Sequence, residues 1–396
     1  MQDEGEKMII YLDNGATTMI DTEVIKEMTP YFTEKYGNAS SLHMMGVWAR
    51  QAVEESRTTI AKSIGAKDDE IIFTSGGTES NNFAIKGIAF ANKDKGKHII
   101  TTKIEHDCVL NSCKWLQTQG FEITYLPVDK EGYVRPEDLE KAIRKDTILV
   151  SIIHGNNEIG TIQDLKKLGE ICKKNNVYFH TDACQSYTKT ELDVKKQNLD
   201  LITLNAHKIH GPKGVGVLYL KKGVKITPWQ HGGGHEFKMR SGTENVHGIV
   251  GFAKAVNLAM NTKHAKHMTK LRDKLIDEVM KKIPDTLLNG PKGDNRLCNN
   301  VNLSFLYVEG EAIGAYLDAE RICSSTGSAC SSKSLEPSHV LIAIGLKPEQ
   351  AHGSLRLTLS RFTTEEEINK TLKVLPGIIE KLRKMSPLTK LVKKML

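Results

Sequence analysis

Lys208 stands where an apolar strand is expected to end. The run Asp200–Leu204 is typical of a buried strand, and Asn205-Ala206-His207-Lys208-Ile209-His210-Gly211-Pro212 follows it directly. Because burial disfavours the charged ammonium, a lysine in such a place loses its proton readily and becomes a nucleophilic amine. Such an amine forms a Schiff base with an aldehyde, and pyridoxal phosphate is the common aldehyde cofactor. The alternative is an exposed loop lysine, which leaves the two flanking histidines unexplained.

Asp182 closes another expected strand, Val177–Asp182, within the motif His180-Thr181-Asp182-Ala183-Cys184-Gln185. A carboxylate at the carboxyl edge of a central strand faces the crevice in which α/β sheets bind ligands. It could keep a pyridine nitrogen protonated, which makes the ring a better electron sink. Taken alone, Asp182 is better explained as a helix cap. Lys208 follows 26 residues later, a spacing that fits one crossover connection.

Two further polar side chains follow expected strands. His106, in Lys103-Ile104-Glu105-His106, could stack on an aromatic cofactor or move protons, or it could be an ordinary surface histidine. Asn157, in His154-Gly155-Asn156-Asn157-Glu158-Ile159-Gly160, is a candidate hydrogen-bond donor to a cofactor or substrate. The alternative for Asn157 is a turn-forming Asn-Asn pair.

Two glycine-containing segments could bind phosphate. Gly76-Gly77-Thr78 joins a strand to a helix, where free backbone amides attract anions, although a plain N-cap explains the same residues. Gly232-Gly233-Gly234 leads through Arg240-Ser241-Gly242-Thr243 into another helix and could reach a phosphate, either in its own subunit or across a subunit boundary. The alternative for this segment is a plain mobile loop.

A reactive cysteine and a carboxylate-binding arginine are expected in the last third of the chain. Cys330 stands alone among small residues in Ser324–Ser334, which is unusual because cysteine prefers burial and an exposed thiol is often reactive. Cys184 and Cys323 are interpreted as structural. Arg356, in the alternating strand pattern Ser354–Leu359, could bind a carboxylate in a bidentate manner or be an ordinary edge-strand arginine.

Alternating strand and helix patterns must position these residues. They predict a doubly wound α/β fold, in which a mostly parallel mixed sheet has helices on both faces. We expect a large domain over residues 19–263 and a smaller α+β domain over 1–18 and 264–396. The smaller domain includes the cysteine loop 323–336 and a basic C-terminal tail. Seven strands are expected in the first two thirds of the chain: Glu70–Thr74, His98–Thr102, Glu122–Leu126, Thr147–His154, Val177–Asp182, Asp200–Leu204 and Gly216–Leu220.

Composition excludes several classes of protein. The chain of 396 residues has no run of about 20 apolar residues that would span a bilayer, and the polar start Met1–Lys7 predicts no secretory signal. Seven cysteines without a Cys-x-x-Cys pair predict a reducing cytoplasm and no intrinsic metal site. Residues 380–396 hold six Lys or Arg and one Glu, so most of the net charge of +7 is in the tail. We therefore expect no direct nucleic-acid binding.

Together these motifs resemble those of the cysteine desulfurases of the NifS/IscS type, from Ile10-Tyr11-Leu12-Asp13-Asn14 to Arg361-Phe362-Thr363-Thr364-Glu365. The resemblance implies a fold-type I pyridoxal-phosphate homodimer that takes sulfur from L-cysteine and releases L-alanine. Lys208 would hold the cofactor, His106 would stack on its ring and move protons, and Cys330 would carry the sulfur as a persulfide. The implied acceptor is an iron–sulfur scaffold protein, a sulfur-relay protein or a tRNA-thiolation protein, and Cys330 could share a transferred cluster.

The resemblance also implies a set of binding residues. The substrate carboxylate would contact Arg356 and Asn157. The cofactor would contact Gly77, Thr78, His106, Asn157, Asp182, Gln185, Asn205, His207, Lys208 and, from the other subunit, Thr243. The chain departs from the family pattern at Asn205, where serine is usual, at Phe237-Lys238 in place of Arg-Gly, at Gly15 in place of alanine, and after Ser386.

Two other readings compete with a cysteine desulfurase. A selenocysteine or cystine lyase, or another enzyme of the aminotransferase type, would use the same cofactor, and an aminotransferase would not need Cys330. A persulfide carrier or scaffold subunit would keep the fold without the activity, and it would lack a visible absorbance band that depends on Lys208.

Overall fold

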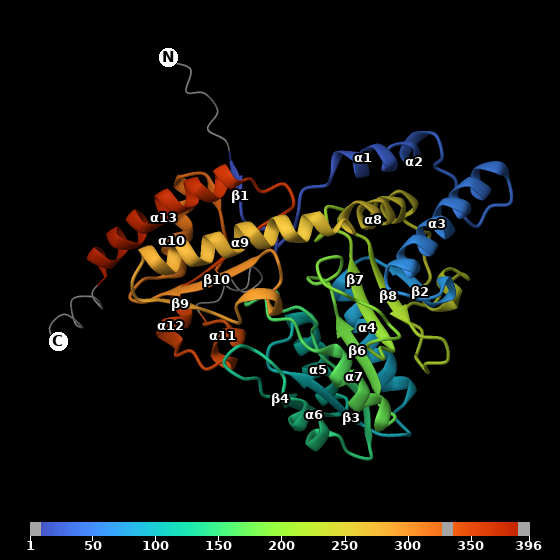
Figure 1. Ribbon diagram of the computed structural model, residues 1–396. Coiled ribbons are helices and arrows are strands. Elements are labelled where there is room, and N and C mark those ends of the chain that lie inside the picture. The colour runs from blue at the N-terminus through green and yellow to red at the C-terminus, as the bar shows by residue number, and fades with distance from the viewer. Residues whose placement is uncertain (1–8, 327–335, 387–396) are drawn as a thin grey trace.

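A seven-stranded sheet organises one part of the computed structural model, which describes residues 9–326 and 336–386 (Figure 1). Across the sheet the strands are β2 (Ile71–Thr74), β8 (Gly216–Leu220), β7 (Leu201–Asn205), β6 (Tyr178–Asp182), β5 (Thr147–Ser151), β3 (His98–Thr102) and β4 (Glu122–Leu126). Only β8 runs against its neighbours, β2 and β7. The predicted mostly parallel mixed sheet is therefore confirmed, with its seven strands.

Helices cover both faces of this sheet. Helices α4 (Gly77–Ala91) and α5 (Asp107–Thr118) pack on one face, and α3 (Met44–Ser63), α7 (Leu165–Lys174) and α8 (Val246–Ala259) pack on the other. Successive strand residues point to opposite faces, so that Ile99 joins one hydrophobic cluster and Ile100 the other. Burial on both faces explains why these strands read as continuous apolar runs in the sequence.

The parallel strands bring the polar ends of β6 and β7 together. The two strands are adjacent, with Asp182 opposite Thr203, so that the residues following each strand meet at one edge of the sheet. Strand β5 ends at Ser151, three residues earlier than predicted. The N–H groups of Ile152 and His154 still donate to β6 carbonyls, but the chain then enters the turn that carries Asn157.

A second, antiparallel sheet has the order β12 (Ser354–Thr358), β10 (Asn300–Phe305) and β9 (Thr286–Leu288). It shares a separate hydrophobic cluster with α9 (Thr262–Lys282), α10 (Gly310–Ala319) and α13 (Glu365–Met385). Strand β1 (Ile10–Tyr11) pairs in parallel with β11 (Ile322–Cys323), so the first described residues lie beside the last third of the chain (Figure 1). The separate hydrophobic cluster of this second sheet supports a division into two domains, whose bounds stay a prediction.

The remaining helices are short and connect the larger elements. They are α1 (Thr22–Met28), α2 (Pro30–Thr33), α6 (Pro136–Ala142), α11 (His339–Ala343) and α12 (Pro348–His352). Over the described residues, none of the helices combines the length and apolar character needed to cross a membrane. Cys330 and the basic tail from residue 387 onward lie outside the described residues.

Candidate active site

A cavity of about 240 Å³ lies at the carboxyl edge of the seven-stranded sheet, where β6 and β7 end and α4 begins. Five residues of its wall have no predicted role: Ala16, Asn81, Cys108, Ile153 and Cys184. Nine of the predicted site residues also line it: Gly77, Thr78, His106, Asn157, Asp182, Gln185, Asn205, His207 and Lys208. The topology thus gathers most of the sequence motifs around one space.

Lys208 is the central base of this cavity. Its amine donates hydrogen bonds to the backbone carbonyls of Gly15 and Ala16, the latter at 2.7 Å. The carbonyl of Gly15 also accepts from Nε2 of Gln185 at 2.8 Å. Burial, and secondarily the positive charge of Arg356, lower the pKa of the Lys208 amine to about 8. Lys208 therefore has the depressed pKa that its sequence position predicts, and the N-terminal segment supplies acceptors that the sequence did not reveal.

Asp182 is held by two donors. Its Oδ1 accepts from the backbone N–H of Cys184 at 2.9 Å, and its Oδ2 accepts from Nδ2 of Asn81 at 2.7 Å. Asn81 is fully buried and lies on α4, one helical turn after Thr78. Its sequence position alone predicts no role, although Asn81 follows the predicted phosphate-binding residue Thr78 by three residues. A carboxylate held in this way presents a defined direction to any ligand in the cavity.

His106 caps the N-terminus of α5. Its Nδ1 accepts from the backbone N–H of Cys108 at 3.2 Å, so the neutral ring carries its proton on Nε2. The thiol of Cys108 lies 3.0 Å from the same nitrogen, and Nδ2 of Asn81 donates to that sulfur at 3.2 Å. A chain of contacts thus runs from Asp182 through Asn81 and Cys108 to His106.

The start of α4 forms a narrow wall of the cavity. A Cβ atom on Gly77 would lie 2.7 Å from Sγ of Cys184 and 3.4 Å from Nδ2 of Asn205, so glycine leaves room that no other residue would. Across from it, His207 contacts Oγ1 of Thr17 through Nδ1 at 3.2 Å. Burial and the charge of Lys208 lower the pKa of His207 to about 4, which keeps its ring neutral. The free amides of the helix start are suited to an anion.

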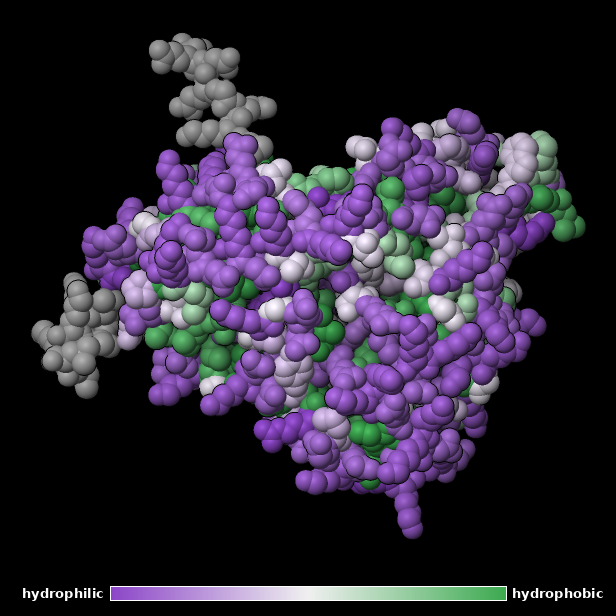
Figure 2. Space-filling model, in the orientation of Figure 1, coloured by the Kyte–Doolittle hydropathy of each residue, from purple (hydrophilic) through white to green (hydrophobic). Residues whose placement is uncertain are grey.

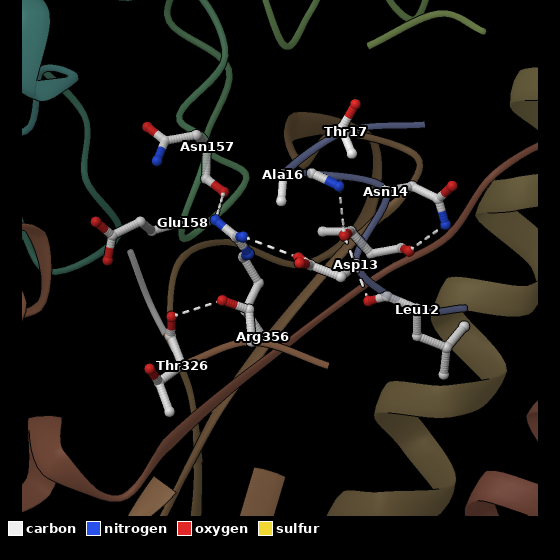
Figure 3. Close-up of polar contacts among 12 residues, drawn as sticks. Leu12, Asp13, Asn14, Ala16, Thr17, Asn157, Glu158, Thr326 and Arg356 are labelled. Carbon is white, nitrogen blue, oxygen red and sulfur yellow. Dashed lines mark hydrogen bonds and ion pairs between the residues drawn. The ribbon is translucent and has the colours of Figure 1, made fainter. Parts of the chain in front are cut away.

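Arg356 lies beside the cavity on β12, with its side chain only 2% exposed (Figure 3). Its Nη2 pairs with Oδ1 of Asp13 at 3.1 Å, and its Nη1 donates to the backbone carbonyl of Asn157 at 3.1 Å. Its Nε is buried and has no hydrogen-bond partner within the part of the chain that the structure describes. The guanidinium therefore lies next to a residue of the cavity wall and keeps a donor free for a ligand.

A buried acid lies beneath His106. Oε1 of Glu105 accepts from Oγ1 of Thr102 at 2.7 Å and from the backbone N–H of Ile153 at 2.9 Å. Its Oε2 has no partner among residues 9–326 and 336–386. Burial raises the pKa of Glu105 to about 8, so this side chain is mostly protonated at neutral pH. It adds no negative charge next to Asp182.

Thr243 lies apart from the cavity. It lines a separate hollow with Asn38, Arg57 and the glycine-rich segment that includes Gly233. Within one chain the structure does not bring Thr243 to Lys208. Cys330 lies outside the described residues.

The glycine-rich segment is anchored at two points. Arg57 forms a bidentate ion pair with Glu236, at 2.9 Å for each contact, and its guanidinium lies 4.8 Å from the ring centre of Phe73 and 5.1 Å from that of Phe237. Glu236, Phe237 and Lys238 all have positive φ angles, of 45°, 56° and 66°. Phe237-Lys238 stand where the family usually has Arg-Gly. The ring of Phe237 and that of Phe73 both contact the guanidinium of Arg57.

The second anchor ties the same segment to the start of α4. Arg240 pairs with Glu79 through two contacts of 2.8 and 3.1 Å. Glu79 in turn accepts from the backbone N–H of Ser75 at 2.8 Å, just before the glycines of the cavity wall. The segment that carries Thr243 is thus fixed relative to Gly77.

Comparisons with known proteins agree with this geometry. Residues 10–371 match the family described as aminotransferase class-V. The chain is 57% identical over 383 residues to cysteine desulfurase IscS of Dictyoglomus turgidum, which covers 96% of this chain and 97% of the relative. It is 55% identical over 386 residues to cysteine desulfurase IscS of Methanosarcina thermophila, covering 97% and 95%.

Solved structures show the same likeness. A NifS-like protein superposes with a TM-score of 0.89 at 41% identity, covering 95% of this chain and all of that one. A structure of SspA in complex with cysteine superposes with a TM-score of 0.81 at 36% identity, covering 90% of this chain and all of that one.

Proposed function

This chain belongs to the class-V aminotransferase family and is a pyridoxal-phosphate-dependent cysteine desulfurase, and we propose that the cavity around Lys208 is its active site. The observation that carries the proposal is the placement of Lys208, Asp182 and His106 around one cavity, with Arg356 beside it. A nucleophilic amine, a carboxylate, an imidazole and a carboxylate-binding guanidinium are the groups that the reaction needs from the protein.

The residues of the cavity fit the cofactor. The amides at the start of α4 suit a phosphate group, and Gly77 leaves space for it. Oδ1 of Asn157 and Oδ1 of Asn205 are buried without a partner among the described residues, as polar atoms at a ligand site often are. When bound, pyridoxal phosphate supplies an electron sink that stabilises negative charge on the α-carbon of the substrate.

We assign the roles of the chain's own groups as follows. Lys208, with its lowered pKa, would hold the aldehyde of the cofactor and, when free, could take a proton from the substrate. Asp182, which lines the cavity, would keep the pyridine nitrogen of the cofactor protonated. His106, with its proton on Nε2, would contact the cofactor ring and move a proton to or from the substrate. Arg356 binds the carboxylate of the substrate.

The remaining cofactor contacts follow from the same cavity wall. Gln185 and Asn157 would contact the ring hydroxyl, and Asn157 would also contact the substrate. Four other residues of the cavity wall would hold the phosphate: Gly77, Thr78, Asn205 and His207. Asn205 replaces the usual serine and offers an amide in place of a hydroxyl, which still donates hydrogen bonds.

Cys330 is the proposed sulfur carrier, on the strength of the sequence motif. Its thiolate would attack the sulfur of L-cysteine and form the S–S bond of a persulfide on Cys330. The carbon–sulfur bond breaks with its electron pair left on the carbon, which takes up a proton to give L-alanine. The described flanks of its loop support this role. Ser325 pairs through its backbone with Arg356, and Ser338 donates from its hydroxyl to Glu158, the neighbour of Asn157. Both flanks of the cysteine loop are therefore attached next to the site.

We further propose a homodimer in which the partner brings Thr243 to the phosphate. Large apolar side chains are exposed over residues 19–48, and hydrophobic residues gather where α2 leads into α3 (Figure 2). Tyr36 is 69% exposed, Leu42 91% and Met44 62%, which is a feature of surfaces that bind another protein. An association through this region would explain why Thr243 lies outside the cavity of its own chain.

The sulfur acceptor and the compartment rest on the family resemblance. We propose an iron–sulfur scaffold protein, a sulfur-relay protein or a tRNA-thiolation protein as the acceptor, in the cytoplasm. No group of three His, Cys, Asp or Glu side chains is arranged to hold a metal ion within the described ranges, 9–326 and 336–386.

One experiment tests the central assignments. The purified enzyme is incubated with L-cysteine, alanine is measured, and the persulfide is trapped by alkylation and located by peptide mapping. Borohydride reduction followed by mass spectrometry locates the cofactor. We expect the persulfide on Cys330 and the cofactor on Lys208. Lys189 is the matched control, because it is a second lysine whose pKa burial lowers to about 8.

Other outcomes distinguish the competing functions. If the cofactor is found on Lys189, the assignment of Lys208 is wrong. If Cys330→Ala keeps full activity with L-cysteine, the assignment of Cys330 is wrong. Faster turnover of selenocysteine or cystine than of L-cysteine would favour a lyase.

A further inference from the structure

Asp13 gives the proposed carboxylate-binding site a second, negative charge. Oδ1 of Asp13 lies 3.1 Å from Nη2 of Arg356, and this is the only ion pair of Arg356 within the described residues. The side chain of Asp13 is 18% exposed, against 2% for Arg356. The two residues are 343 positions apart in the chain, and the start of the chain meets β12 here. The pair has no net charge.

Asp13 begins a short segment, ending at Ala16, that reaches the cavity. Figure 3 shows the guanidinium of Arg356 between Asn157 on one side and Asp13 on the other, with Ala16 nearby. Asn157 and Ala16 both line the cavity. The carbonyl of Ala16 accepts from the amine of Lys208 at 2.7 Å. The segment from Asp13 to Ala16 therefore spans from the guanidinium to the amine.

Charge decides which molecules such a pair accepts. This step rests on the proposed function, in which Arg356 binds the carboxylate of the substrate. A substrate that carries only a carboxylate would place two carboxylates on one buried guanidinium, and burying unbalanced charge is costly. An α-amino acid brings an ammonium together with its carboxylate, so the group of four charges stays balanced.

The position that the amino group of the substrate must take also favours an amino acid. In the proposed function the amine of the substrate would react where Lys208 holds the cofactor, so it would have to arrive close to Lys208. Asp13 contacts the guanidinium, and three residues further on Ala16 contacts the amine of Lys208. The charge of Asp13 also acts on that amine, although burial and Arg356 outweigh it. An incoming ammonium would therefore arrive near a carboxylate.

We propose that Asp13 and Arg356 together recognise the amino-acid zwitterion, with Arg356 binding the carboxylate and Asp13 the α-ammonium. Asp13 is then a specificity-determining residue, which selects amino acids against thiols and acids that lack the amine. A hydrogen bond between charged groups contributes about 1.5–3 kcal/mol, which corresponds to roughly 10- to 150-fold in affinity.

The test compares ligands that differ only in the amine. KM for L-cysteine and the inhibition constant of 3-mercaptopropionate are measured for the holoenzyme and for Asp13→Asn. The dissociation constants of L-alanine and propionate, measured by calorimetry, give a readout without turnover. We expect Asp13→Asn to weaken L-cysteine and L-alanine at least tenfold, and to leave 3-mercaptopropionate and propionate unchanged or bound more tightly.

Two control variants separate the possible failures. Asp21→Asn removes another carboxylate that pairs with an arginine, Arg361, outside the cavity wall, and it should leave the ratio between the two ligand types unchanged. Arg356→Ala should weaken every carboxylate ligand.

Each remaining outcome has one meaning. If Asp13→Asn weakens both ligand types equally, Asp13 only orients Arg356 and the proposal is wrong. If it changes neither ligand type, the proposal is also wrong, while the role of Arg356 stands. If Arg356→Ala has no effect on any ligand, the assignment of Arg356 in the proposed function fails instead.

Discussion

The side-chain amide of Asn81 donates a hydrogen bond to the carboxylate of Asp182, with 2.7 Å between Nδ2 and Oδ2. The backbone N–H of Cys184 holds the other oxygen at 2.9 Å. Because Asn81 is fully buried on α4 and Asp182 ends β6, the contact sets the direction of the carboxylate relative to the cavity. Asn81 is therefore a positioning residue that acts through Asp182.

Replacing Asn81 tests this positioning. Asn81→Ala should weaken cofactor binding by roughly 10- to 150-fold, because a hydrogen bond to a charged group is worth about 1.5–3 kcal/mol. It should also shift the visible absorbance of the bound cofactor, which a purely structural role would not do. Cofactor titration and absorbance spectra measure both effects. Asn82→Ala is the matched control, since the amide of Asn82 donates to the carbonyl of Thr78 at 2.9 Å and does not contact Asp182.

The contact between Gly77 and Cys184 predicts a rescue. Gly77→Ala places a Cβ atom 2.7 Å from Sγ of Cys184, which is closer than packed atoms approach, so we expect a loss of cofactor affinity of at least tenfold. Cys184→Ala removes that sulfur and should restore most of the loss in the double variant. Cofactor titration of the two single variants and the double variant checks this. If Gly77→Ala lowers the cofactor affinity equally with and without the Cys184 sulfur, the new Cβ atom clashes with another atom.

Lys208 predicts a pH dependence for cofactor attachment. Only the neutral amine attacks an aldehyde, and the pKa of Lys208 is lowered from 10.5 to about 8 by burial and by Arg356. The rate at which cofactor-free protein binds pyridoxal phosphate covalently should therefore rise with pH and level off above about 8. Stopped-flow absorbance measures the rate. In Arg356→Met the midpoint should move to higher pH, because a neighbouring positive charge is lost; an unchanged midpoint would leave burial as the sole cause.

The ion pair between Arg57 and Glu236 should dominate the stability of the segment that carries Thr243. Both side chains are buried, at 4% and 5% exposure. Arg57→Met leaves the charge of Glu236 buried without its partner, so we expect a loss of about 3–5 kcal/mol in the free energy of unfolding. Urea denaturation measures this loss.

An exposed arginine provides the comparison. Arg144 pairs with Glu122 and Asp146 at the surface, and Arg144→Met should cost less than about 1 kcal/mol. Losses of similar size in Arg57→Met and Arg144→Met would contradict the importance of burial.

Glu105 predicts that stability falls as pH rises. The pKa of Glu105 is raised from 4.5 to about 8 in the folded chain, because burial disfavours the ionised form. Between these pH values the folded state binds a proton that the unfolded state has lost. The free energy of unfolding therefore decreases with increasing pH by up to about 1.4 kcal/mol per unit from this group. Above pH 8 the contribution is fully lost.

Replacing Glu105 tests whether this side chain causes the fall in stability with pH. Glu105→Gln should flatten the decrease in stability between pH 5 and 8, as measured by urea denaturation at several pH values. Glu122→Gln, at an exposed carboxylate of β4, is the control and should leave the slope as it is. An unchanged slope in Glu105→Gln would mean that Glu105 is already ionised in the folded state over this pH range.

The sequence alone predicted the seven-stranded sheet and the carboxyl edge of that sheet as the place of the proposed active site. Apolar runs of strand length ended in polar motifs, and parallel strands collect such ends at one edge, which is why Lys208 and Asp182 could be expected together. Burial at the end of β7 also indicated a lysine with a lowered pKa. These features are local, because they depend on residue types within one strand and the turn that follows it.

Contacts between distant residues could only come from the tertiary structure. Asp13 and Arg356 are 343 positions apart, Arg57 and Glu236 are 179 apart, and Asn81 and Asp182 are 101 apart. No spacing in the sequence marks these pairs, because sheet order and helix packing decide which side chains meet. The sequence alone thus determined which groups are available for the reaction, and the fold decided which of them touch, since a hydrogen bond depends on positions in space and not along the chain.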